Sequence, residues 1–294
     1  MISVVYITAR SLKPMLDGPW FAQGQYELLA ESLKKQTYTD YEVVVVDREN
    51  PLPRPELAFL FGQVRYVRPR ETPWTRLEAF CPSSARNTGL AVARGEIIFG
   101  LDDCSHFDGD LFQQIVEWWE RGYCLVPNIV RDDVPSAALP QVPMRQERAG
   151  GIWAYPHQMA RDVNGYDERF DGCLALEDWE FSERLINAGA KLMMHAAARV
   201  YLHPHGSRYG KLYRCAHATR ELLRGQVRGN NPWTSAQLAT FTDEWCTFAG
   251  AMDGPNLRCA TDATHCDTRE RPSAEVVAIM SGYESHPWLN LGAP

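Results

Sequence analysis

The stretch from residue 95 to 105 constrains the fold most, because it joins an apolar run to two adjacent carboxylates. Residues 97–101 have the length and composition of a strand that is covered on both faces. Asp102 and Asp103 follow at once, and such a pair is costly at the end of a buried strand unless positive charge lies nearby. Ligands bind at that end of the strands in an open α/β sheet. The stretch therefore indicates a divalent metal that holds nucleotide phosphates. The alternative is that both aspartates cap a helix over residues 108–121.

Apolar runs and helical patterns alternate along the first 120 residues. In chain order, the sequence predicts strand 2–7, helix 21–35, strand 42–46, strand 64–67, helix 83–93, strand 95–101 and helix 110–120. This alternation predicts a largely parallel sheet. Ser83 or Ser84 is the expected N-cap of helix 83–93. Thr8, Arg10 and Asp47 follow the first two strands, so we expect polar side chains to gather at one edge of the sheet.

The following 80 or so residues contain short strands, a polar loop and three motifs. The predicted segments are strand 123–127, loop 131–146, a Gly-Gly segment at 150–155, an Asn-Gly-Tyr-Asp-Glu-Arg-Phe run at 164–170, a helix from Glu177 that ends at Gly189, and strands at 191–195 and 199–202. The apolar positions of the helix recur at helical spacing, and a glycine is a common residue just after a helix.

Composition limits the class of protein. The chain has 294 residues, 45% of them hydrophobic, and a net charge of −7, so it is an ordinary globular protein and no general polyanion binder. No apolar run reaches the roughly 20 residues of a membrane helix, and a strand pattern starts at once where a signal peptide would lie. Eight scattered cysteines without a glycosylation sequon favour free thiols in a reducing cytoplasm. Cys259, His265 and Cys266 lack the second pair of a zinc site.

Taken in order, these segments resemble a known family. The first 206 residues resemble the GT-A glycosyltransferases of the family 2 type, and residues 150–185 resemble the carboxyl-terminal module of galactosyltransferase-like enzymes. The segments that carry the first resemblance are 3–10, 29–37, 41–47, 84–90 and 95–103; the second rests on the Gly-Gly pair, the 164–170 run and Glu177-Asp178.

The resemblance implies an α/β fold of the GT-A type, with a Rossmann-like, mostly parallel central sheet flanked by helices. It divides residues 1–206 into a nucleotide-binding half, 1–105, and an acceptor and catalytic half, 106–206. Residues 207–294 lie outside the resemblance, and their pattern predicts a mainly helical extension.

On the donor side, the resemblance implies that a nucleotide-sugar, most often a UDP-sugar in this family, binds across the strand ends. The implied nucleotide contacts are Thr8, Arg10, Asp47, Arg86 and Asp102. Taken singly, Asp47 could also be a turn residue and Arg86 a surface charge. Three residues of a diphosphate lid are expected after the last strand, namely Arg208, Tyr209 and Lys211.

A metal site is expected beside the nucleotide. The resemblance implies that Asp102 or Asp103 holds Mn²⁺ or Mg²⁺, hard cations that prefer oxygen ligands, and that His203 or His205 completes the shell, with a slight preference for His203. The family usually has Asp-X-Asp here, whereas Cys104 occupies the second aspartate position. Asp103 could replace it, or the thiol could favour softer ions. For the histidines, a simple turn is the alternative.

On the acceptor side, Asp178 is the implied catalytic base, and Glu177 the implied ligand of acceptor hydroxyls. Neighbouring carboxylates raise one another's pKa, although both residues would also suit the start of a helix through its dipole. Gly150 and Gly151 are expected beside the acceptor, and Trp153 and Tyr155 are candidates for stacking on an acceptor ring.

The expected function is a metal-dependent, inverting transfer of a sugar to a hydroxyl acceptor, either a glycan or a modified nucleic acid. The basic stretch 208–228 would serve an anionic acceptor, including nucleic acid, or is a solvated helix face. One alternative is a non-catalytic nucleotide-sugar or glycan binder with a decayed metal motif. A sugar nucleotidylyltransferase is the other, although the glycine-rich loop that it needs is missing after the first strand.

Overall fold

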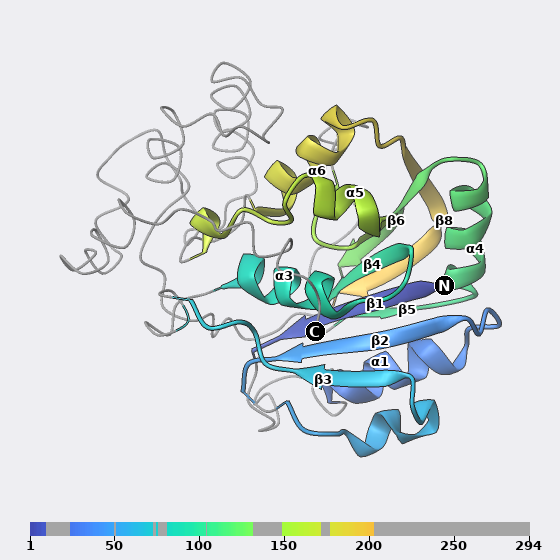
Figure 1. The fold of residues 1–294 in the computed structure, drawn as a ribbon. Coiled ribbons are helices and arrows are strands. Elements are labelled where there is room, and N and C mark those ends of the chain that lie inside the picture. The colour runs from blue at the N-terminus through green and yellow to red at the C-terminus, as the bar shows by residue number, and fades with distance from the viewer. Residues whose placement is uncertain are drawn as a thin grey trace.

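The computed structural model describes residues 1–9, 24–49, 51–72, 75, 81–103, 105–131, 149–171 and 177–202 (Figure 1). The expected extension over residues 207–294 and nearly all of the loop expected at 131–146 lie outside these ranges. In the described part, a five-stranded sheet and a three-stranded sheet are covered by helices.

The larger sheet contains the four strands that the sequence predicted within residues 2–101 and a fifth, β7, that it did not, in the order β3-β2-β1-β4-β7. Its strands are β1 (Ile2–Thr8), β2 (Tyr41–Asp47), β3 (Val64–Val67), β4 (Ile97–Asp102) and β7 (Trp153–Pro156). The first four are parallel, and β7 runs antiparallel to β4. The predicted largely parallel sheet is therefore confirmed.

The strands of this sheet bury both faces, as expected for near-continuous apolar runs. Val4 and Val45 pack in one cluster with helix α1 (Gln25–Lys34) and helix α4 (Leu111–Glu120). Val5 and Val44 pack in a second cluster with helix α3 (Pro82–Val92), α5 (His157–Asp162) and α6 (Glu177–Asn187). Figure 1 shows α1 on one side of the sheet and α3, α5 and α6 on the other. Two short 3₁₀ helices, η1 (Pro55–Leu60) and η2 (Glu168–Phe170), complete the described helices.

The smaller sheet joins the middle of the chain to its last described strand, in the order β5-β8-β6. Strand β5 (Ser105–Phe107) pairs antiparallel with β8 (Leu192–Leu202), and β6 (Cys124–Arg131) pairs parallel with β8. The prediction of two short strands at 191–195 and 199–202 is wrong, because one strand spans both. The pairing with β6 shifts between Pro127 and Asn128, and this irregularity accounts for the break in the apolar pattern.

Both helix caps that were proposed from the sequence are wrong. Helix α4 begins after Asp110, whose side chain accepts a hydrogen bond from the backbone N–H of Gln113, so Asp102 and Asp103 do not cap it. Helix α3 begins after Cys81, which makes no side-chain cap, and neither Ser83 nor Ser84 is the N-cap. The described helices include none that is long and apolar enough to cross a membrane.

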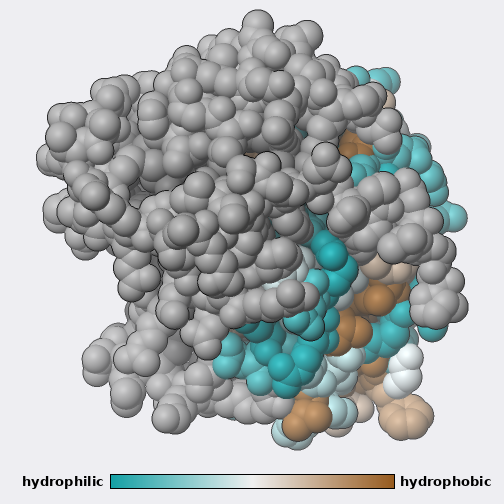
Figure 2. All heavy atoms as spheres, turned by 60° about the vertical axis from the view of Figure 1, so that its left-hand side comes forward, coloured by the Kyte–Doolittle hydropathy of each residue, from teal (hydrophilic) through white to brown (hydrophobic). Residues whose placement is uncertain are grey.

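The described surface carries few large exposed hydrophobic side chains: Leu52, Phe59, Phe61 and Met194. The face drawn in Figure 2 shows a continuous hydrophilic area among its described residues, with smaller hydrophobic areas around it. Scattered apolar side chains of this kind are normal on a globular protein.

Candidate active site

The predicted clustering of polar residues at one edge of the sheet is confirmed. The register pairs Thr8, the last residue of β1, with Asp47, the last of β2. It also pairs Ile7 with Asp102, the last residue of β4. Parallel strands bring their carboxyl ends to the same edge, which is where ligands bind in open α/β sheets.

Arg86 lies at the centre of the site and joins its two halves. From α3, its Nη2 donates to Oδ1 of Asp102 at 2.9 Å, and its Nη1 donates to Oε1 of Glu177 at 2.7 Å. The Arg86 side chain is 7% exposed, so it is not the surface charge that the sequence left as an alternative. Burial alone would lower the pKa of Arg86, but Asp102 and Glu177 raise it well above its usual value. The guanidinium is therefore a permanent internal cation between these carboxylates.

Two consecutive glycines let the backbone approach this cluster. A Cβ on Gly151 would lie 2.2 Å from Nη2 of Arg86 and 3.1 Å from Oδ2 of Asp102. At Gly150 a Cβ would lie 3.7 Å from Oδ2 of Asp178. The backbone of the Gly-Gly segment thus passes close to the carboxylates of Asp102 and Asp178. Glycine permits such a close approach because it has no side chain.

Asp178 lies at the first turn of α6, next to Glu177 and half-buried. Its Oδ1 accepts a hydrogen bond from the backbone N–H of Trp179 at 2.8 Å. Burial and the neighbouring Glu177 raise the pKa of Asp178 to about 7, against the opposing effect of Arg86. Glu177 is 4% exposed and uses Oε1 for Arg86, while its Oε2 is buried and has no hydrogen-bond partner among the described residues. Asp178 therefore has the affinity for protons that a base needs near neutral pH.

Thr8 connects the first strand to the second carboxylate of the pair. Its hydroxyl lies 2.8 Å from Oδ2 of Asp103 and 3.1 Å from Oε1 of Gln25, and all three residues are buried. A hydroxyl has one proton, so it can donate to only one of these two oxygens at a time. Thr8 and Asp103 therefore lie together, next to the Asp102–Arg86 pair along the chain.

Asp47 is fully buried and already engaged. Its Oδ2 accepts hydrogen bonds from the hydroxyl of Tyr26 at 2.6 Å and from Nη2 of Arg54 at 3.0 Å, and its Oδ1 accepts from the backbone N–H of Glu49. Sequence reasoning missed Tyr26, Arg54 and Gln25. A tyrosine within the expected helix 21–35 is equally consistent with simple core packing, and no local pattern distinguishes Arg54 from other loop arginines.

Two of the expected acceptor contacts are not where that role requires them. Trp153 and Tyr155 lie on β7 and are 0% and 1% exposed. Their rings pack against Phe181 of α6, with centroids 6.3 and 5.2 Å away. The prediction that these rings stack on an acceptor is therefore wrong, since alternate residues of a strand covered on this face point into the core.

Several expected site residues lie outside the described ranges. They are Arg10, Cys104, His203, His205, Arg208, Tyr209 and Lys211. The strand that precedes the two histidines ends at Leu202, which pairs with Ser105, two residues after Asp103.

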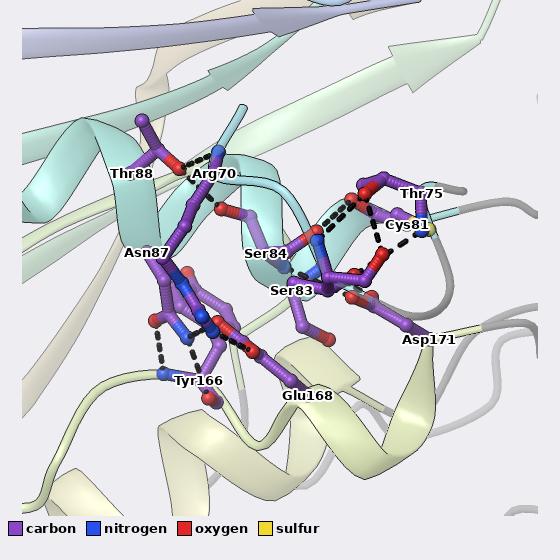
Figure 3. A network of polar contacts seen from close by, with 11 residues as sticks. Arg70, Thr75, Cys81, Ser83, Ser84, Asn87, Thr88, Tyr166, Glu168 and Asp171 are labelled. Carbon is purple, nitrogen blue, oxygen red and sulfur yellow. Dashed lines mark hydrogen bonds and ion pairs between the residues drawn. The ribbon is translucent and has the colours of Figure 1, made fainter. Parts of the chain in front are cut away.

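A second polar network holds the Asn-Gly-Tyr-Asp-Glu-Arg-Phe segment against α3 (Figure 3). Asn87 exchanges hydrogen bonds with the backbone of Tyr166, accepting from its N–H at 2.7 Å and donating to its C=O at 2.8 Å. Its Nδ2 also donates to Glu168, which pairs with Arg70. The motif thus docks against α3 through Tyr166 and Glu168.

Asp102 and Asp103 are the described residues to compare with the expected metal site. Within the described ranges, no three His, Cys, Asp or Glu side chains gather closely enough to bind a metal. Asp102 is nevertheless 37% exposed and accepts from Arg86 through Oδ1 only, and Asp103 lies beside it. Two carboxylates next to a substrate diphosphate would provide the oxygen ligands that Mn²⁺ and Mg²⁺ prefer, so these residues fit such an ion in chemistry.

Comparisons with known proteins agree with this geometry. The sequence model of Glycosyl transferase family 2 matches residues 28–173. No curated protein matches the whole sequence at a significant level.

Solved structures with a similar fold include S. aureus TarS 1–349 in complex with UDP, at 15% identity and a TM-score of 0.56, where 86% of this chain and 72% of that chain are covered. The same protein in complex with UDP-GlcNAc matches at 14% identity and a TM-score of 0.59, over 88% of this chain and 76% of that chain. The chain therefore carries a glycosyl transferase family 2 domain on a GT-A fold, and it is a glycosyltransferase.

Proposed function

We propose that the chain transfers a sugar from a UDP-sugar to an acceptor hydroxyl, with inversion at the anomeric carbon and with Asp178 as the base. The observation that carries this proposal is the Arg86 bridge. It ties Asp102, at the end of β4, to Glu177, which directly precedes Asp178. A donor-side carboxylate and the candidate base thus share one cluster.

The donor side follows from the strand ends. Thr8, Asp102 and Asp103 lie at or just after the ends of β1 and β4, and we propose that they line the diphosphate, with Asp47, Arg86 and Arg10 nearer the nucleoside. UDP is the nucleotide to test first, because S. aureus TarS, which shares the fold, has been solved with UDP and with UDP-GlcNAc.

The transfer step itself needs a base and a stabilised leaving group. The Asp178 carboxylate takes the proton of the acceptor hydroxyl while that oxygen attacks the anomeric carbon. The bond between that carbon and the diphosphate oxygen breaks on the opposite side, and UDP leaves with the electron pair. Glu177, whose Oε2 has no hydrogen-bond partner among the described residues, would accept a hydrogen bond from a second acceptor hydroxyl.

A divalent cation would neutralise the charge that develops on the diphosphate. We propose that Asp102 and Asp103 hold Mn²⁺ or Mg²⁺, with His203, His205 or Cys104 as the residues to test for a further ligand. The hydrogen bond from Arg86 to Oδ1 of Asp102 would orient this carboxylate before the cation binds. Arg208, Tyr209 and Lys211 remain the proposed diphosphate lid, and Gly150 and Gly151 the proposed acceptor wall.

The test measures UDP release and sugar transfer from UDP-GlcNAc, UDP-glucose and UDP-galactose with Mn²⁺, using a panel of simple glycosides as acceptors. Asp178→Asn keeps the shape of the side chain but removes the base, so kcat is expected to fall about 10²–10⁴-fold, while UDP binding measured by calorimetry stays near wild type. Near-normal turnover of this variant would refute the base assignment. UDP-sugar binding by the wild-type protein without any release or transfer would instead favour a non-catalytic binder.

A further inference from the structure

Asp171 caps a helix that lies almost ninety residues earlier in the chain. Its Oδ1 accepts a hydrogen bond from the backbone N–H of Ser83 at 2.9 Å, and its Oδ2 accepts from that of Ser84 at 3.2 Å. Asp171, Ser83 and Ser84 are all 0% exposed. Figure 3 shows the Asp171 side chain pointing at the first turn of α3 from the segment that carries η2.

The start of α3 needs this external acceptor. Cys81 occupies the N-cap position, and its side chain does not cap the helix; Pro82, the first helical residue, has no N–H. The second and third N–H groups, those of Ser83 and Ser84, are the ones that an N-cap side chain normally satisfies, and a buried helix end without such partners is costly. Asp171 therefore replaces a local cap.

The same short stretch of α3 holds the segment that precedes the candidate base. Ser83 and Ser84 bind Asp171, and Arg86 binds Glu177. Only five residues separate Asp171 from Glu177 in the sequence. The chain that leads into Asp178 is thus attached to α3 at both of its ends.

We propose that Asp171 is a positioning residue for sugar transfer: by holding its segment on the first turn of α3, it sets where Asp178 lies relative to Asp102. Asp102 is placed independently, because it belongs to β4 in the centre of the sheet. Without the Asp171 attachment, the start of α6 is still held by the Arg86–Glu177 pair and by the packing of Phe181 in the core, but the chain that leads into it has lost its hold on the first turn of α3. This inference rests on the proposed function of Asp178.

The expected result for Asp171→Ala is a fall in kcat of about tenfold or more with little change in the donor KM, because small misplacements of a reacting group reduce rate strongly. UDP binding stays near wild type, since Thr8, Asp102 and Asp103 do not depend on this attachment. Asp171→Asn keeps one oxygen that can accept from Ser83, so it restores part of the lost kcat.

Asp110→Ala is the matched control. Asp110 also caps a helix, α4, through the N–H of Gln113 and contacts Thr37, but it takes no part in the candidate active site. Its loss is expected to lower the melting temperature without lowering kcat. Equal falls in kcat for the Ala variants of Asp110 and Asp171, at similar losses of melting temperature, would overturn the proposal.

Hydrogen exchange separates this inference from the proposed function. Peptides that cover residues 177–187 are expected to exchange faster in Asp171→Ala and unchanged in Asp110→Ala, whether or not the wild-type protein transfers sugar. Unchanged exchange in both variants would overturn the positioning role. Should Asp171→Ala fail to fold, kcat and hydrogen exchange are measured for Asp171→Asn and compared with those of Asp110→Asn. A wild-type kcat together with wild-type exchange in Asp171→Asn would overturn the positioning role.

Discussion

At the scale of single residues, the site depends on how charges are distributed around Arg86. Asp102 and Glu177 each give one oxygen to its guanidinium, and Asp178 lies next to Glu177 and accepts a backbone N–H at its Oδ1. Removing a buried partner from such a cluster leaves an uncompensated charge. The bridge therefore ties the carboxylates of Asp102 and Glu177 to one buried cation, while burial and Glu177 raise the pKa of Asp178.

The rate of transfer is expected to rise with pH through about 7. The reaction needs the ionised form of Asp178, whose pKa is raised to about 7 by burial and by Glu177. Below that pH, kcat falls about tenfold per unit, because the ionised fraction of Asp178 falls about tenfold with each unit of pH. A pH profile of kcat for the wild-type protein, recorded where circular dichroism shows it folded, checks this. A profile that is flat between pH 5.5 and 7.5 contradicts the assignment, and the residual activity of Asp178→Asn is expected to lack this limb.

At the scale of elements, α3 is the reference to which the rest of the site is attached. It packs on β1 and β2 and contacts α5, α6 and η2. Backbone N–H groups and side chains from a single stretch of it, residues 83–87, bind the segments on the acceptor side. A helix that is fixed to the sheet can thus hold donor and acceptor sides in one geometry, provided that it packs closely.

Gly89 makes that close packing possible, so Gly89→Ala is expected to destabilise the protein. A Cβ there would lie 2.2 Å from Cγ1 of Val5 on β1. An alanine usually favours a helix by about 1 kcal/mol over glycine, but overpacking costs about 1–3 kcal/mol. We therefore expect a net loss in the free energy of unfolding, measured with urea.

The double variant Val5→Ala with Gly89→Ala tests this cause. A Cβ on Gly89 would lie 3.4 Å from Cβ of Val5, an ordinary contact once Cγ1 is gone. The two substitutions are therefore expected to be less harmful together than the sum of their separate effects. A stabilising Gly89→Ala, or strict additivity of the two, would show that α3 is not held against β1 in this way.

At the scale of the whole molecule, the chain combines the sheet and helices of a glycosyl transferase family 2 domain with a cluster that is largely buried. Asp102 is the most exposed member of the Arg86 cluster. A ligand that binds there meets a preformed arrangement, so binding adds to the stability of the folded state without the cost of building the site.

UDP is expected to raise the melting temperature, and more so with Mn²⁺. A ligand that binds only the folded form at one hundred times its Kd adds about 2.7 kcal/mol to stability. The shift is measured by thermal denaturation with UDP, with UDP and Mn²⁺, and with UDP and a chelator. AMP serves as the matched nucleotide control. Equal shifts for UDP with and without Mn²⁺ would argue against the proposed cation at Asp102 and Asp103.

The sequence by itself determined four of the five strands of the larger sheet, their parallel direction and the gathering of Thr8, Asp47 and Asp102 at one edge. These features follow from local periodicity and from the rule that parallel strands end on the same side. The start of α6 at Glu177 could also be predicted, because the pattern of apolar residues is helical from there.

Only the tertiary structure decided which side chains meet. That Arg86 binds Asp102 and Glu177, that Asp171 caps α3, and that Trp153 packs in the core all depend on residues between 16 and 91 positions apart coming together. Local propensity carries no information about such partners, because a polar or aromatic residue has the same sequence pattern whether it faces a ligand or another element. The packing of α3 between sheet and acceptor-side helices settles these contacts, since it fixes which buried polar groups face one another.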